Sequence, residues 1–166
     1  MDGFRKVSPG DARRIILECR RRKANPDIRD GYWEKFLQMA VDPESFPGLD
    51  IRGLFSDGRP RSLSFTTPCR GRLFYLNQLM ALEKGKGWGR MLAEHVVGRH
   101  RNIYLLANPD GDEKVRDVYR GIPGLEELKL RNRDWGRFSA FLKCDPERRA
   151  SFAIRIRKFL GNAVFA

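Results

Sequence analysis

Residues 83–97 read EKGKGWGRMLAEHVV. Three glycines, Gly85, Gly87 and Gly89, alternate with larger residues directly before a segment whose composition favours a helix. Glycine has no Cβ, so the backbone amides of such a loop can approach a ligand closely. The first turn of a helix also offers unpaired N–H groups and the positive end of the helix dipole. The stretch therefore predicts an anion site at a loop-to-helix junction, suited to a diphosphate.

The segments around this loop alternate between strand and helix patterns. RLFYLNQL (72–79) predicts a strand before the loop, and a helix is expected from about residue 87 to 99. NIYLLA (102–107) predicts a buried strand, and EKVRDVYRGI (113–122) predicts a short helix. A central strand therefore leads into the glycine loop and its helix.

The N-terminal part adds a strand, two helices and a hairpin. FRKV (4–7) predicts a short strand, and Ser8-Pro9-Gly10-Asp11 is a helix-start signal with Ser8 as the N-cap. DGYWEKFLQMAVDP (30–43) predicts a second helix. Asp57-Gly58 stands between two alternating runs and predicts a β-hairpin.

The C-terminal part ends in an ambiguous basic tail. LEELKLR and GRFSAFLK predict a strand pair, and Asp145-Pro146-Glu147 then signals a helix start. However, Ile154-Arg155-Ile156-Arg157 alternates as a strand would, so a basic amphipathic helix is the favoured interpretation and a strand the alternative. We expect a mixed α/β fold with a central sheet of about six to seven strands, flanked by about four helices and followed by a basic C-terminal extension. Residues 1–145 would form the domain, and residues 146–166 would pack on it or on a partner.

Two common phosphate-binding fingerprints do not fit the loop. No GxxxxGK[ST] string occurs, and the third glycine of GxGxxG would fall on Arg90. Residues 84–89, KGKGWG, instead resemble the [Q/R]-x-x-G-x-[G/A] motif of the GNAT superfamily of acyl-CoA N-acyltransferases, with Lys84 in place of the leading Arg or Gln.

The resemblance extends over residues 4–143, with motif support from 72 to 121. In that family the loop joins the fourth strand to the third helix, and the next strand is followed by a short helix ending in a tyrosine. Tyr119 stands in that place, whereas the family's usual Asn seven residues earlier is Asp112 here.

The resemblance implies an acyl-CoA site, with acetyl-CoA as the co-substrate and no metal. Its diphosphate would lie on Lys84, Gly85, Lys86, Gly87, Trp88, Gly89 and Arg90, and its pantetheine arm would pair with the backbone of Leu79 and Met80. A primary amine would attack the thioester directly, and Tyr119 would protonate the departing thiolate. A phenol suits that role because the reference pKa values of phenol and thiol lie close together, near 10 and 8.5. The other interpretation of Tyr119 is a packing residue of the helix.

No general base is identifiable. Asn77 and Gln78 lie where a base could stand but have no basic group, and neither Glu83 nor Asp112 is favoured. His95 and His100 fit structural or exposed positions better than catalytic ones.

Charge is the main clue to the acceptor. The chain of 166 residues has a net charge of +12 and basic clusters outside the loop, which favour a nucleic-acid or nucleic-acid-associated amine over a cationic one. The clusters are Arg20–Lys23, Arg59 with Arg61, Arg70 with Arg72, Arg99 with Arg101, and Arg148, Arg149, Arg155, Arg157 and Lys158 of the tail. The alternatives are a non-catalytic nucleic-acid-binding module on the same scaffold and a chemically diverged GNAT fold.

The remaining features describe the setting. No run of about 18 apolar residues predicts a membrane span, and no signal peptide is recognisable, so a cytoplasmic protein is expected. Three dispersed cysteines predict free thiols and no zinc site. A monomer or a homodimer is expected.

Overall fold

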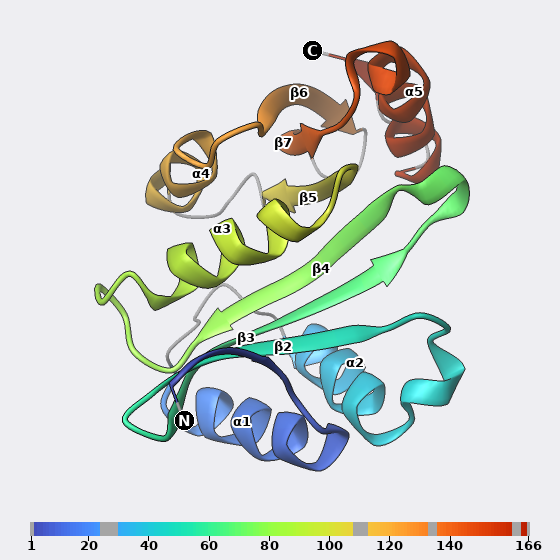
Figure 1. Cartoon of the computed structure of the whole chain (residues 1–166). Helices are drawn as coiled ribbons and strands as arrows, with labels where there is room; N and C mark the ends of the chain where they lie inside the picture. The colour runs from blue at the N-terminus through green and yellow to red at the C-terminus, as the bar shows by residue number, and fades with distance from the viewer. Residues whose placement is uncertain (1, 24–29, 108–112, 133–135, 161–163, 166) are drawn as a thin grey trace. The chain divides into compact units, whose positions relative to one another are not determined.

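The structure is a computed structural model that describes residues 2–23, 30–107, 113–132, 136–160 and 164–165. Along the chain its elements follow the predicted order, extended by a fifth helix and a last, two-residue strand (Figure 1). Strands pair in both parallel and antiparallel fashion, which confirms the mixed α/β class. The chain divides into two compact units, Met1–Pro68 with Leu76–Val96, and Cys69–Tyr75 with Val97–Ala166.

The sheet of the first unit is built on a hairpin. Strand β1 (Gly3–Lys6) pairs antiparallel with β2 (Asp50–Ser56), which pairs antiparallel with β3 (Arg59–Pro68). The residues of β4 (Phe74–Ala81) from Leu76 onward continue this order beside β3. Asp57 and Gly58 both have left-handed φ angles, 52° and 68°, as a tight hairpin turn requires. The predicted Asp-Gly hairpin is thus confirmed.

Two helices cover one face of this sheet (Figure 1). Helix α1 (Pro9–Arg21) begins where predicted, and the Ser8 hydroxyl accepts a hydrogen bond from the Asp11 amide at 3.1 Å. Helix α2 (Asp30–Val41) leads into the 3-10 turn η1 (Pro43–Ser45). Both helices bury apolar side chains against β3, and the rings of Phe36 and Phe65 lie 5.4 Å apart. This core includes Ile15, Ile16, Phe36, Met39, Leu63, Phe65 and Met80.

The second unit contains the first residues of β4 and the strands that follow it along the chain. The first residues of β4 pair parallel with β5 (Ile103–Ala107), and β5 pairs antiparallel with β7 (Gly136–Lys143). Strand β6 (Glu126–Asn132) pairs with β7 and with the short β8 (Val164–Phe165), both antiparallel. Helix α4 (Glu113–Arg120) leads from β5 toward β6 along the chain.

The basic tail forms a helix, so the favoured interpretation is confirmed and the strand alternative is wrong. After the 3-10 turn η3 (Pro146–Arg148), α5 runs from Arg149 to Phe159. Phe152 and Ile156 are buried in the core of the second unit, whereas Ile154 is 43% exposed. A strand would have placed Ile154 and Ile156 on the same face. The helix period therefore decides which isoleucine is buried.

Several predicted boundaries differ from the structure by one or two residues, and the start of β4 has a clear physical reason. The strand expected over residues 72–79 begins two residues later, as β4. The 3-10 turn η2 (Arg70–Arg72) occupies the positions before it, and Gly71 and Arg72 there have left-handed φ angles of 77° and 63°. Left-handed backbone cannot continue a strand, so β4 starts only after the turn.

Candidate functional site

The glycine loop opens directly into a helix. Helix α3 (Trp88–Arg99) makes its first intrahelical hydrogen bond from the Met91 amide to the Gly87 carbonyl, at 3.0 Å. The amides of Trp88, Gly89 and Arg90 precede that bond and have no intrahelical acceptor. Open amides and a helix dipole are what an anion needs at a helix N-terminus, and the anion site at this junction stays a prediction.

Two of the glycines meet a conformational requirement. Gly85 and Gly87 are exposed and have left-handed φ angles of 73° and 75°. A Cβ built on either residue would meet no atom within 4 Å. A side chain at either position would therefore meet no steric clash, but the left-handed backbone conformation favours glycine. Both positions leave the loop backbone bare on its outer side.

Gly89 differs from the other two glycines. It lies within α3, and a Cβ there would stand 3.8 Å from Leu79 Cδ2 and 3.9 Å from the Ala81 Cβ. These are ordinary van der Waals contacts, so packing within the protein would accept an alanine at this position. Neither packing nor backbone conformation therefore requires glycine at position 89.

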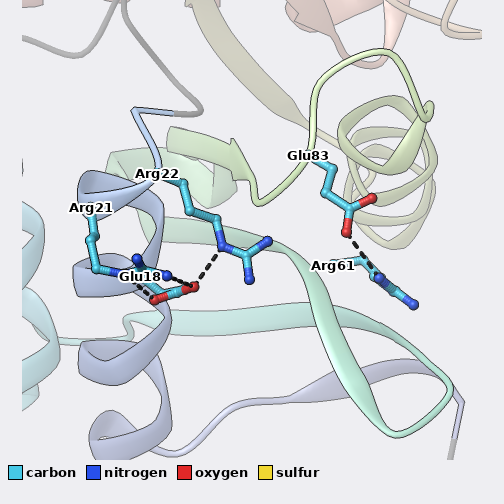
Figure 2. A network of polar contacts seen from close by, with 5 residues as sticks. All are labelled: Glu18, Arg21, Arg22, Arg61 and Glu83. Carbon is cyan, nitrogen blue, oxygen red and sulfur yellow. Dashed lines mark hydrogen bonds and ion pairs between the residues drawn. The ribbon is translucent and has the colours of Figure 1, made fainter.

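Residues of strand β3 hold both ends of the glycine loop through hydrogen bonds. The Leu82 amide donates to the Arg61 carbonyl at 2.9 Å, and the Ser62 hydroxyl donates to the Trp88 carbonyl at 3.1 Å. The Arg61 guanidinium donates to Glu83 and to Asp57, each at 3.2 Å, and lies 5.6 Å from the centre of the Trp88 ring. Figure 2 shows the Arg61–Glu83 pair, drawn with the Glu18–Arg21–Arg22 cluster of the same unit. Sequence analysis placed Arg61 only in a basic cluster and did not indicate that Arg61 and Ser62 hold the loop, because Glu83 and Trp88 lie 22 and 26 residues away along the chain.

The cations of the loop fall into two kinds. Arg90 donates to Glu94 at 2.8 Å, one helical turn along α3. Lys84 and Lys86 are exposed, and within the part of the chain that the structure describes neither side chain has an ion-pair partner. The two lysines are therefore available to an incoming anion, whereas Arg90 would have to share its charge with Glu94.

Leu79 and Met80 of β4, predicted to pair with the pantetheine arm, differ in how deeply their side chains are buried. Met80 is 1% exposed and belongs to the core of the first unit, and Leu79 is partly buried and approaches Gly89. Because its side chain is buried, Met80 could reach a ligand only through its backbone, and its expected pairing with the pantetheine arm stays a prediction.

Tyr119 belongs to the second unit, whereas the glycine loop belongs to the first. Its ring packs edge-on against Phe141 of β7 with ring centres 5.5 Å apart. Burial raises the pKa of Tyr119 to about 12, so its phenol keeps the proton throughout the neutral range.

Comparison with known proteins rests on structure. No family model and no curated protein matches the sequence. A Desulfovibrio desulfuricans protein assigned to the GNAT family of acetyltransferases superposes with a TM-score of 0.69 at 13% identity, covering 86% of this chain and 98% of that one. The chain has the GNAT fold.

Two further proteins with the GNAT fold show how broadly it is used. The aminoglycoside enzyme AAC(6')-Ib, solved with ribostamycin and coenzyme A, superposes with a TM-score of 0.66 at 14% identity, covering 91% of this chain and 95% of its own. Ribosomal-protein-alanine N-acetyltransferase from Brucella melitensis superposes with a TM-score of 0.63 at 14% identity, covering 86% and 99%. At these identities the likeness concerns the fold.

The candidates for a general base make other contacts in this GNAT fold. The Asn77 amide donates to Thr67 at 2.7 Å, and the Gln78 amide donates to the Leu79 carbonyl at 3.0 Å. The His95 ring stacks on Phe4 with ring centres 4.0 Å apart, and His100 packs against Phe74. Glu83 is paired with Arg61, and Asp112 lies outside the described residues.

The described residues also bear on metal sites and membrane spans. Among the described residues, no group of three or more His, Cys, Asp or Glu side chains could hold a metal ion. Cys19, Cys69 and Cys144 are free thiols, as predicted. In the same residues, no helix combines the length and apolar character needed to cross a bilayer.

Proposed function

We propose that the protein is an N-acyltransferase that uses acetyl-CoA. The observation that supports this most strongly is the bare left-handed backbone at Gly85 and Gly87, directly before the open amides of α3. The CoA diphosphate would accept hydrogen bonds from the amides of residues 85–90. Lys84 and Lys86 would add charge without first breaking an ion pair.

The pantetheine arm would continue along β4. In this proposal its amides pair with the backbone of Leu79 and Met80, as an added strand pairs with a sheet. A backbone N–H at this position would donate to the thioester carbonyl and stabilise the charge that develops on its oxygen. Because the Met80 side chain is buried, changing it would act through packing and not through direct contact.

The proposed chemistry is direct transfer. The lone pair of a primary amine attacks the thioester carbon, a C–N bond forms, and the C–S bond breaks with its electrons on sulfur. Tyr119 donates its proton to this thiolate, and solvent takes the proton lost by the amine. Because its pKa is raised, the phenol of Tyr119 stays protonated at neutral pH, although it is a weaker acid than an ordinary phenol.

For the acceptor, we propose an amine on a nucleic acid or on a protein bound to one. Support comes from the net charge of +12, which attracts polyanions and repels polyamines or basic peptides. The GNAT-fold proteins compared above include one that acts on an aminoglycoside and one named for a ribosomal protein, so the fold itself does not select the acceptor. The rival, a non-catalytic nucleic-acid-binding module, would use the loop for backbone phosphate.

A thiol-release assay tests the proposal. Acetyl-CoA is incubated with the protein and with separate pools of RNA, ribosomal protein and small amines, and free CoA is measured colorimetrically. We expect release above the uncatalysed rate with at least one pool, and thermal stabilisation by acetyl-CoA alone. Stabilisation by RNA but not by acetyl-CoA or CoA would support the non-catalytic module instead.

A further inference from the structure

Two basic clusters that are far apart in the sequence meet in the second unit. The Arg155 guanidinium donates to the Arg70 carbonyl at 2.8 Å, and the Arg148 guanidinium donates to the Gly71 carbonyl at 3.3 Å. Arg70 and Arg72 flank Gly71 in the turn η2. Figure 1 shows α5 beside this turn, which precedes β4. Four arginines thus gather around one turn, and we call them the η2–α5 patch: Arg70, Arg72, Arg148 and Arg155.

The patch is not neutralised by its surroundings. All four arginines are exposed, and none has a carboxylate partner among the described residues. Most of the other basic clusters do have such partners: Arg21 and Arg22 pair with Glu18, and Arg61 pairs with Asp57 and Glu83. Two acidic residues lie at η3, Asp145 directly before it and Glu147 within it. Asp145 pairs with Arg101 at 2.6 Å, and Glu147 also lies close enough to Arg101 to contribute to its raised pKa.

Arg148 and Arg155 still have donors to offer. Each guanidinium has five N–H groups and uses one of them on a carbonyl of the turn. Those bonds fix the position of the guanidinium groups and leave the remaining N–H groups for a ligand. A positioned guanidinium suits a phosphate, which it can bind through two parallel hydrogen bonds.

An exposed aromatic residue stands next to the patch. Phe159 is 65% exposed and lies four residues after Arg155, on the same face of α5. Its ring lies 6.0 Å from that of Tyr75. Arginines beside an exposed aromatic ring favour an unpaired base stacked on the ring, with the adjoining phosphates on the arginines.

We propose that the η2–α5 patch binds single-stranded nucleic acid. The arginines contact its phosphates, and Phe159 stacks on a base. The patch would supply the surface that holds the acceptor, and in that respect the inference rests on the proposed function. Binding at the patch is a separate property, since neither Arg70 nor Phe159 belongs to the glycine loop.

The test compares two double variants with equal charge change. Arg70→Gln with Arg72→Gln removes two cations of the patch but keeps the backbone carbonyls that Arg148 and Arg155 bind. The control, Arg21→Gln with Arg22→Gln, removes two cations that are already paired with Glu18. Fluorescence anisotropy with labelled oligouridylate measures the dissociation constant over a series of salt concentrations.

We expect wild type and the control to bind alike and the patch variant to bind about tenfold more weakly or worse at about 0.1 M salt. Its log–log salt slope should fall by about 1.4, since each contact to a single strand contributes about 0.7. Phe159→Ala should weaken oligouridylate binding about fivefold or more, with little effect on a duplex of equal length. Thermal melting confirms that each variant is folded.

Several outcomes would overturn the inference. The inference would be wrong if wild type did not bind oligouridylate, or if the two double variants lost the same amount of oligouridylate affinity. It would also be wrong if wild type bound a duplex as tightly as the single strand, or if it bound phosphatidylserine vesicles but not RNA. Calorimetry with acetyl-CoA on the same variants separates the two proposals. Unchanged CoA binding beside lost RNA selectivity would leave the acyltransferase proposal intact, and absence of CoA binding beside patch-dependent RNA binding would leave the patch.

Discussion

Tyr119 shows how a single side chain can suit two roles. Its ring packs on Phe141 and its phenol is partly buried, which raises its pKa to about 12. Packing alone would explain the ring, but it gives no use for the hydroxyl. The proposed role uses the proton that burial keeps in place.

Replacing Tyr119 with Phe separates these roles. The ring contact with Phe141 would remain, while the proton donor would be lost. We expect kcat to fall by about 10²–10⁴ and the affinity for acetyl-CoA to stay nearly unchanged. Steady-state kinetics with calorimetry measure both quantities. Tyr104→Phe, which alters another buried tyrosine of the same unit, is the control, and an equal kcat in the two variants would remove Tyr119 from the mechanism.

Glu127 provides a test of stability against pH. Hydrogen bonds from Arg120, with a further one from Ser139, lower the pKa of Glu127 from 4.5 to about 2. The ionised form is therefore favoured in the folded state. Its contribution is present above pH 4.5 and is lost as the pH falls from about 4.5 to about 2.

Glu127→Gln should thus destabilise the protein only where Glu127 is ionised. We expect a loss of about 1–2 kcal/mol at pH 7, after allowing for the exposure of Arg120 to solvent, and almost none near pH 2. Urea unfolding of both proteins at the two pH values measures the difference. A loss of equal size at both would show that the ion pair with Arg120 is not its source.

At the scale of elements, the glycine loop depends on a neighbouring strand. Arg61 and Ser62 of β3 hold Leu82, Glu83 and Trp88, so the loop backbone is fixed on both sides of its two left-handed glycines. A loop held in this way loses less conformational freedom when it binds a ligand.

Arg61→Gln should therefore weaken acetyl-CoA binding about five- to tenfold, or about 1 kcal/mol, because Glu83 and Asp57 lose their charged partner. Arg52→Gln is a matched control. Arg52 pairs with Asp50 within β2, the strand next to β3, and the Arg52 side chain is 18% exposed against 19% for Arg61. Calorimetry measures acetyl-CoA binding by both variants. Equal affinity in Arg61→Gln and Arg52→Gln would show that Arg61 does not position the loop.

Elements with a local signal could be predicted from the sequence. Asp57-Gly58 gave the hairpin, Ser8-Pro9 gave the start of α1, and the alternating glycines gave the loop before α3. Each signal acts through the conformation of a few neighbouring residues. The fastening of the loop by Arg61 could not be predicted, since Arg61 and Glu83 are 22 residues apart. The start of β4 was missed for a similar reason, because contacts from α5 accompany the left-handed turn η2.

At the scale of the whole molecule, the tail is part of a core. The sequence predicted a basic extension, and in this segment Arg148 and Arg155 are exposed. The opposite face of α5 buries Phe152 and Ile156 among the side chains of β5, β6 and β7. Removing the residues after Asp145 would open this core, so the basic surface has to be tested by point substitutions.

Phe152→Ala measures the contribution of α5 to the fold. Phe152 is 1% exposed, and its truncation should cost about 3–5 kcal/mol of unfolding free energy. Ile154→Ala on the exposed face of the same helix should change it by less than about 0.5 kcal/mol. Denaturant unfolding gives both values, and similar costs at the two positions would mean that α5 is not docked as described.

The central claim is that the loop of residues 84–90 binds the diphosphate of acetyl-CoA. Isothermal titration calorimetry of acetyl-CoA into wild type, Gly87→Glu and Gly58→Glu tests it most directly. Gly58 matches Gly87 in its left-handed φ angle, its exposure and its open surroundings, but it lies in the hairpin turn. We expect wild type and Gly58→Glu to bind acetyl-CoA and Gly87→Glu not to bind it, because a carboxylate would stand where the diphosphate is proposed to lie. Absence of binding by wild type, or undiminished binding by Gly87→Glu, would contradict it.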